Sequence, residues 1–248
     1  MEGLDLSRHV ARHGPLPSLL TASLGATLAE ALATVHKQGM LHRDLKPANV
    51  LLGPNGPKVI DFGLAVFAES SVSLTAPNTV VGTPSCMPPE QARGDRPLTP
   101  AVDVYALGAV MLFAASGRLP YQAANIHVLF HQVTDPETAP DLSGAPNELV
   151  PLLTAMLAHQ AEDRPALSDV VQQCRGVIEA QGFNDQAGGG LVVVAESLRD
   201  DGGRGLEDEL ADRGGPAALR WDADLPQVDL EADRVHRLSG LAAGEEPL

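Results

Sequence analysis

Hydrophobic and polar positions along the chain predict a mainly helical protein with one short β-hairpin. Between residues 18 and 35, leucines at positions 20, 24, 28 and 32 share one helical stripe with Val35, and Gly39 then ends the helix. Residues 101–116 are apolar on nearly every face, which is typical of a helix surrounded by other elements. Further helices are predicted at about 123–133, 147–158 and 166–180, joined by proline-rich turns.

Two short apolar runs in residues 50–60, VLLGPNGPKVI, flank a Gly-Pro-Asn-Gly turn and predict the hairpin. Asn49 precedes the first run and Asp61 follows the second. Because paired strands lie about 5 Å apart, we expect these two side chains to be neighbours at the open end of the hairpin. Residues 64–100 show no sustained period and are rich in Ser, Thr and Pro, which predicts a long loop of the kind that is usually functional.

Composition divides the chain near residue 181. The net charge of −15 argues against nucleic acid or an anionic membrane as a partner. Residues 182–248 hold 15 acidic residues against six arginines and no lysine, with repeated glycine clusters. Such a composition cannot offset the entropy of ordering, so we predict a domain at 1–181 followed by an acidic, glycine-rich, mostly disordered tail at 182–248.

The remaining bulk features favour a cytoplasmic protein. Two cysteines, Cys86 and Cys174, have no spacing typical of metal sites, which favours a reducing compartment without structural disulfides or zinc. The start, MEGLDLSRHV, lacks the layout of a signal peptide. The longest apolar run, residues 104–115, is too short to span a bilayer, so we expect no membrane segment in this chain.

Candidate chemistry gathers around the hairpin. Asp44 lies five residues before Asn49, and Lys46 lies between them. The amide of Asn49 and the carboxylate of Asp61 suit Mg²⁺, which prefers hard oxygen ligands and keeps places for phosphates. Phosphoryl transfer needs a carboxylate that accepts a hydroxyl proton and cations that neutralise charge on the equatorial oxygens. The cluster therefore predicts a phosphoryl-transfer site.

Five sequence strings resemble the eukaryotic-type protein kinase family, in the family's order. They are HRDLKPAN at 42–49, DFG at 61–63, GTPSCMPPE at 82–90, DVYALG at 103–108 and DRP at 163–165. The resemblance covers residues 1 to about 180, and the Ala, Gly and Pro bias suggests a bacterial relative. It implies a serine/threonine kinase, because Lys46 two places after Asp44 is the signature of that class.

Catalytic and cofactor roles follow from this resemblance. Asp44 would be the catalytic base, Lys46 would contact the transferred phosphate, and Thr83 would bridge the two. The implied cofactors are ATP and Mg²⁺, and the implied partner is a protein substrate with a Ser or Thr hydroxyl. The implied cofactor ligands are Leu51 beneath the adenine, Lys46 on the phosphate, and Asn49 and Asp61 on the metal.

Structural and regulatory roles are implied in the same way. The structural residues would be His42, Phe62, Asp103 and the pair of Glu90 with Arg164. Arg43 would receive a phosphorylated residue of the loop, for which the candidates are Ser70, Ser71, Ser73, Thr75 and Thr79. Four other histidines show no ligand spacing and are predicted to be surface or helix-packing residues: His36, His127, His131 and His159.

The family places a glycine-rich loop, a strand lysine and a helix glutamate before the hinge, which MEGLDL resembles. We therefore expect a kinase-like large lobe that lacks the small β-rich lobe. Three interpretations stay open: a catalytic lobe that is weak or inactive alone, a kinase-like scaffold or binding module, and a lobe completed by another chain. An open apolar surface near Leu51 and residues 1–6 would then favour self-association.

Overall fold

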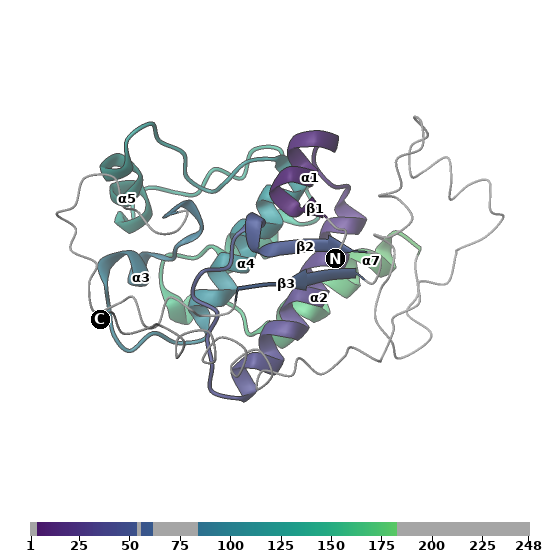
Figure 1. Ribbon diagram of the computed structural model, residues 1–248, viewed down its shortest axis with the longest axis horizontal. Helices are drawn as coiled ribbons and strands as arrows, with labels where there is room; N and C mark the ends of the chain where they lie inside the picture. Colours follow the sequence, from purple (N-terminus) through teal and green to yellow (C-terminus); the bar gives the residue numbers. More distant parts are fainter. Residues whose placement is uncertain (1–3, 54–55, 62–83, 183–248) are drawn as a thin grey trace, which may run out of the picture.

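The computed structural model describes residues 4–53, 56–61 and 84–182, and these form a helical lobe with a small sheet on one side (Figure 1). The elements are β1 (Leu4–Asp5), α1 (Leu6–His13), α2 (Ser18–Lys37), β2 (Val50–Gly53), β3 (Gly56–Val59), α3 (Pro89–Arg93), α4 (Ala101–Ser116), α5 (Ile126–Thr134), α6 (Val150–Met156) and α7 (Leu167–Ala180). Short 3-10 turns lie at Pro47–Asn49, Pro84–Cys86 and Ala161–Asp163. Apart from Gly182, the predicted tail lies outside the described residues.

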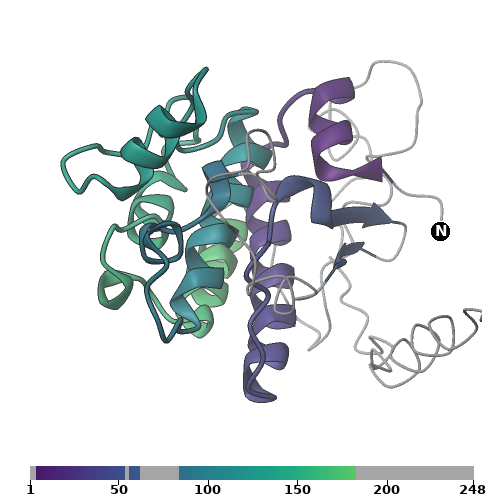
Figure 2. The ribbon, with the colours of Figure 1, turned by 60° about the vertical axis from the view of Figure 1, so that its left-hand side comes forward.

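Helix α4 is the centre of the lobe, as its uniform apolarity predicted. Thirteen of its residues are buried, and it packs against α2 on one side and α6 on another. Helix α2 in turn packs along α7, so that α2, α4 and α7 lie side by side (Figure 2). This contact with several neighbours explains why α2 buries Thr21, Ser23 and Gly25 as well as its predicted leucine stripe.

By length and composition alone, α2 could cross a membrane, and no other helix in the described part of the chain could. The core helix of a soluble protein meets the same measure, and 61% of the apolar window of α2 is buried inside the protein. Its packing between α4 and α7 is that of a core helix. The sequence-based expectation of no membrane segment rested on residues 104–115 alone, and α2 is the longer apolar helix.

The predicted hairpin is confirmed, and it belongs to a three-stranded antiparallel sheet of order β1-β2-β3. Val50 pairs with Val59 and Gly53 with Gly56, while Leu51 lies opposite Asp5 of β1. Val50 and Leu52 are buried in the core, whereas Leu51, which points to the other face, is half-buried. Strand β1 was not predicted, because two residues carry no alternation.

Two sequence-based expectations are wrong in part. Residues 64–100 were expected to be loop, but α3 lies within them, because five residues are too few for a helical period. Pro89 begins this helix and Gly94 ends it in a left-handed conformation at φ 78°. The surface near residues 1–6 was expected to be apolar and open, but Leu6 is fully buried, because α1 turns it into the core.

The helical glycines give a matched stability test. A Cβ at Gly108 of α4 would lie 2.9 Å from the Cβ of Met156, whereas a Cβ at Gly176 of α7 meets nothing within 4 Å. We expect Gly108→Ala to lower the free energy of unfolding by about 1–3 kcal/mol through overpacking. Gly176→Ala should raise it by about 0.5–1 kcal/mol, because alanine is the better helix former. Urea unfolding of both variants measures this, and a stable Gly108→Ala protein would contradict the packing of α4 on α6.

Candidate active site

A buried carboxylate fixes the loop that precedes β2. Asp103, in the first turn of α4, has no exposed surface. Its Oδ2 accepts a hydrogen bond from the backbone N–H of His42 at 2.8 Å, and its Oδ1 accepts one from the N–H of Arg43 at 2.8 Å. The ring of His36, at the end of α2, donates to Oδ2 at 2.7 Å. One side chain therefore ties this loop to both α4 and α2.

The backbone of the loop takes an unusual path at Arg43. Its φ of 63° lies in the left-handed region, which a residue with a side chain rarely adopts. His42 is fully buried, and its ring makes two hydrogen bonds. The Asp44 N–H donates to Nδ1 at 3.3 Å, and Nε2 donates to the carbonyl of Ile60 at 3.3 Å. The ring thus connects the loop to the residue that follows β3.

Three of the predicted active-site residues meet beside this turn. The Nζ of Lys46 lies 2.7 Å from Oδ2 of Asp44, in an ion pair whose side chains are 21% and 36% exposed. The amide nitrogen of Asn49 donates to the Asp44 carbonyl at 2.8 Å and approaches Oδ2 of Asp44 at 3.4 Å. A partly exposed carboxylate, an ammonium and an amide therefore share one small patch, as the sequence predicted.

Asn49 and Asp61, at the end of the hairpin, carry oxygen atoms of the type that bind magnesium. The N–H of Ile60 donates to the carbonyl of Asn49 at 2.9 Å, which continues the β2–β3 pairing and brings Asp61 next to Asn49. The amide nitrogen of Asn49 is bonded to Asp44, so the amide oxygen is not used in that contact, and Asp61 is exposed. An amide oxygen and a carboxylate are hard ligands of the kind that Mg²⁺ takes together with phosphates. Their role as metal ligands remains a prediction.

Several predicted site residues lie outside the described residues. These are Phe62, Thr83 and the hydroxyl residues Ser70, Ser71, Ser73, Thr75 and Thr79. Their implied catalytic, structural and regulatory roles stay predictions, as does the role of Arg43 in receiving a phosphate. Leu51 lies half-buried on the open face of β2, and its place beneath an adenine is likewise a prediction.

The predicted pair of Glu90 and Arg164 is present. Two guanidinium nitrogens of Arg164 reach the two oxygens of Glu90 at 2.7 and 2.9 Å, and the arginine side chain has no exposed surface. Arg164 also donates to the carbonyls of Ala101 and Ala158 and lies over the Tyr105 ring at 4.9 Å. Because a buried charge needs such compensation, this pair anchors α3 to the start of α4.

Sequence reasoning missed two polar residues of the site. His36 was expected to be a surface or helix-packing residue, but its side chain is 10% exposed and bonds to Asp103. Gln91 of α3 was not singled out, yet its amide nitrogen donates to the carbonyl of Arg43 at 2.8 Å. Their partners lie 67 and 48 positions away in the chain, so neither contact leaves a spacing signal.

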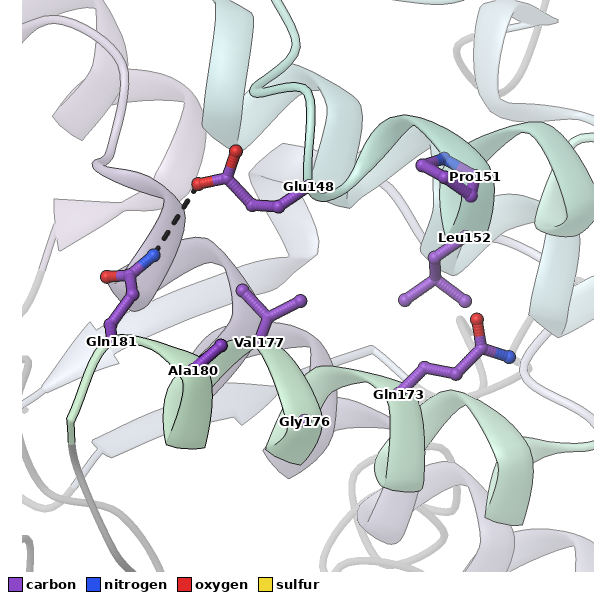
Figure 3. A pocket seen from close by; sticks show the side chains of 8 residues that line it. All are labelled: Glu148, Pro151, Leu152, Gln173, Gly176, Val177, Ala180 and Gln181. Carbon is purple, nitrogen blue, oxygen red and sulfur yellow. Dashed lines mark hydrogen bonds between the residues drawn. The ribbon is translucent and has the colours of Figure 1, made fainter.

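Other polar and apolar features do not belong to this site. Burial raises the pKa of the Cys86 thiol to about 12, which makes it a poor nucleophile despite its position near Asp44 and Lys46. A hollow of about 340 Å³ lies between α6 and α7, and Figure 3 shows its mainly apolar lining, with Gln181 bonded to Glu148 at its edge. No residue of the catalytic patch lines this hollow.

Asp103→Asn tests the buried carboxylate. An asparagine offers one acceptor where three donors converge, so a buried N–H loses its partner. We expect the free energy of unfolding to fall by about 3 kcal/mol or more. Glu30→Gln, which breaks an exposed ion pair with Arg175, is the control and should change little, because water screens that pair. Equal effects of the two substitutions in urea unfolding would contradict the proposed anchoring.

His42 makes stability depend on pH. Burial lowers the pKa of this histidine, against smaller opposing contributions from Asp103 and other acids. Near and below the unfolded pKa of about 6.5, His42 therefore binds a proton more readily in the unfolded chain than in the folded one. The free energy of unfolding then decreases as the pH is lowered. We expect the decrease in the free energy of unfolding from about pH 7.5 to about pH 5.5 to be larger in the wild type than in His42→Gln. Parallel losses in denaturant unfolding would show that His42 is not the cause.

Comparisons with known proteins place this site in a family. The family model for the protein kinase domain matches residues 1–174. The chain is 42% identical over 182 residues to the serine/threonine-protein kinase AfsK of Streptomyces coelicolor, covering 73% of this chain and 22% of that protein. It is 37% identical over 202 residues to PkaA, a serine/threonine-protein kinase of the same organism, covering 80% of this chain and 36% of that protein.

A third relative is the DNA damage-responsive serine/threonine-protein kinase RqkA of Deinococcus radiodurans, 41% identical over 156 residues, or 61% of this chain and 23% of that protein. The chain thus spans between about a fifth and just over a third of the length of these curated relatives. The chain therefore belongs to the protein kinase family, in the group of bacterial serine/threonine kinases of the eukaryotic type.

Proposed function

We propose that these residues form the catalytic lobe of a kinase that transfers the γ-phosphoryl group of ATP to Ser or Thr hydroxyls of proteins. The observation that carries the proposal is the patch in which Asp44 meets Lys46 at 2.7 Å and Asn49 at 2.8 Å. The loop that holds this patch is bonded to the buried Asp103, so its geometry is set by the core of the lobe. A rigid support of this kind is what positioned catalysis requires.

Each residue has a definite task in this proposal. Asp44 accepts the proton of the attacking hydroxyl, and Lys46 stabilises the negative charge that spreads over the equatorial oxygens. Asn49 and Asp61 would hold Mg²⁺, which neutralises charge on the ATP phosphates when bound. The half-buried Leu51 supplies an apolar floor for the adenine. The ion pair of Lys46 with Asp44 keeps both groups together before substrate binds.

Full activity also needs a cover over the phosphates. In protein kinases a glycine-rich loop closes over them, and a strand lysine paired with a helix glutamate must be in place. We propose that the 248-residue chain alone transfers phosphate weakly, because phosphates left in water feel only weakened charge contacts. Supplying a small lobe, fused or as a separate chain, should raise the rate. A binding module that uses the lobe as a scaffold is the alternative.

The test compares phosphate transfer to a generic protein substrate by the chain alone, by the chain completed with a small lobe, and by the completed Asp44→Asn variant. We expect transfer to Ser and Thr by the completed protein, and a loss of about 10²–10⁴-fold on removing the base. Asp95→Asn, at a surface ion pair with Arg93, is the matched control and should keep activity.

Each outcome separates the interpretations. Strong transfer by the chain alone would contradict the need for a small lobe. No transfer by any form, with ATP still bound, would favour the scaffold. Equal activity of Asp44→Asn and Asp95→Asn would refute the assignment of Asp44 as the base.

A further inference from the structure

Helix α3 makes two polar contacts from adjacent residues. Glu90 bonds through both carboxylate oxygens to the buried guanidinium of Arg164. Gln91, the next residue, donates from Nε2 to the carbonyl of Arg43 at 2.8 Å. The first contact holds α3 to the core of the lobe, and the second reaches from α3 to the loop that carries Asp44. Helix α3 therefore bridges the core and the catalytic loop.

The carbonyl that Gln91 holds belongs to the peptide that joins Arg43 to Asp44. The other end of that peptide, the N–H of Asp44, donates to Nδ1 of His42 at 3.3 Å. The preceding N–H, that of Arg43, donates to Asp103 at 2.8 Å. The hydrogen bond from Gln91 therefore holds the Arg43–Asp44 peptide at its oxygen. Because Arg43 has a φ of 63°, this peptide needs such contacts to keep an unfavourable backbone conformation.

The chemistry of the contact specifies an amide rather than a carboxylate. The Arg43 carbonyl can only accept a hydrogen bond, so the nitrogen of the Gln91 amide must face it. The other end of that amide, Oε1, is buried and has no hydrogen-bond partner among the residues that the structure describes. An unpaired buried acceptor is unfavourable, and the hydrogen bond from Nε2 to the Arg43 carbonyl compensates for part of that cost. A glutamate here would set oxygen against oxygen.

We propose that Gln91 is a positioning residue for catalysis: it orients the peptide of Asp44 and so links the segment just before α3 to the catalytic base. The inference rests on the proposed function of Asp44. Residues 84–88, which the kinase resemblance places at the end of the activation segment, lead directly into α3. A shift of this segment would therefore reach Asp44 through the Gln91 hydrogen bond.

Gln91→Leu and Gln91→Glu test the contact, since leucine removes the donor at similar size and glutamate replaces it with an acceptor. Gln172→Leu and Gln172→Glu, at an exposed position of α7, are the matched controls. The first measurement is hydrogen exchange in the 248-residue chain. We expect the amides of Arg43 and Asp44 to exchange at least about tenfold faster in both Gln91 variants, while amides of α4 are unchanged. The melting temperature of Gln91→Leu should stay within about 3 °C of the wild type.

The second measurement is phosphate transfer by whichever form of the wild type is active, alone or with a small lobe. We expect kcat to fall by about tenfold or more in Gln91→Leu, and further in Gln91→Glu, because small misplacements of a catalytic group have large effects on rate. The KM for ATP should stay within about twofold, since the nucleotide contacts are not altered. The Gln172 variants should match the wild type in both measurements.

Unchanged exchange at Arg43 and Asp44 in both Gln91 variants would overturn the proposal. A fall in kcat accompanied by faster exchange throughout the lobe would also overturn it, since Gln91 would then be a general stabilising residue. If no form of the wild type transfers phosphate, the proposed function fails, and the exchange measurement still decides whether Gln91 orients this peptide.

Discussion

The buried carboxylate of Asp103 is the interaction on which the site depends. Removing a carboxylate from water is unfavourable by on the order of several kcal/mol, and hydrogen bonds compensate for this cost only if donors surround the carboxylate. Here two backbone N–H groups and the ring of His36 supply them, at 2.7–2.8 Å. The three donors come from α2 and from the loop before β2, so satisfying one charge also brings these segments to α4. The left-handed turn at Arg43 is held by the same contacts.

Helix α4 is suited to this task because it is a rigid, buried element. Its first turn carries Asp103, and its remaining turns are nearly all apolar and packed against α2 and α6. The second buried charge, Arg164, meets the same end of the helix through the carbonyl of Ala101 and the ring of Tyr105. Helix α3 and the loop that carries Asp44 are therefore both held to α4, the first through Arg164 and the second through Asp103. Functional groups held in this way keep their geometry better than groups on an unsupported loop.

The catalytic patch itself is less buried than its support. Asp44 and Lys46 are partly exposed, which the roles proposed for them require, while His42, Asn49 and Asp103 are buried. Phosphoryl transfer requires little covalent chemistry from the protein and relies on positioning and charge. Partly exposed side chains held by a buried polar network are consistent with this reliance on positioning. In the proposal for Gln91, its hydrogen bond acts on Asp44 through the peptide that joins Arg43 to Asp44.

The sequence by itself determined the elements with a strong period and the residues with a strong motif. The leucine stripe of α2, the uniform apolarity of α4 and the turn of the hairpin each predicted an element that the structure contains. The neighbourhood of Asp44, Lys46 and Asn49 followed from their closeness in the chain, and the pair of Glu90 with Arg164 followed from the kinase resemblance.

Only the tertiary structure decided the contacts of His36 with Asp103 and of Gln91 with Arg43, as well as the strand β1 and the burial of Leu6. A hydrogen bond between single residues far apart in the chain repeats nowhere along it, and an element of two to five residues is shorter than the period that would reveal it. Such contacts arise when helices pack and bring distant donors to one acceptor, which is a property of the assembled core.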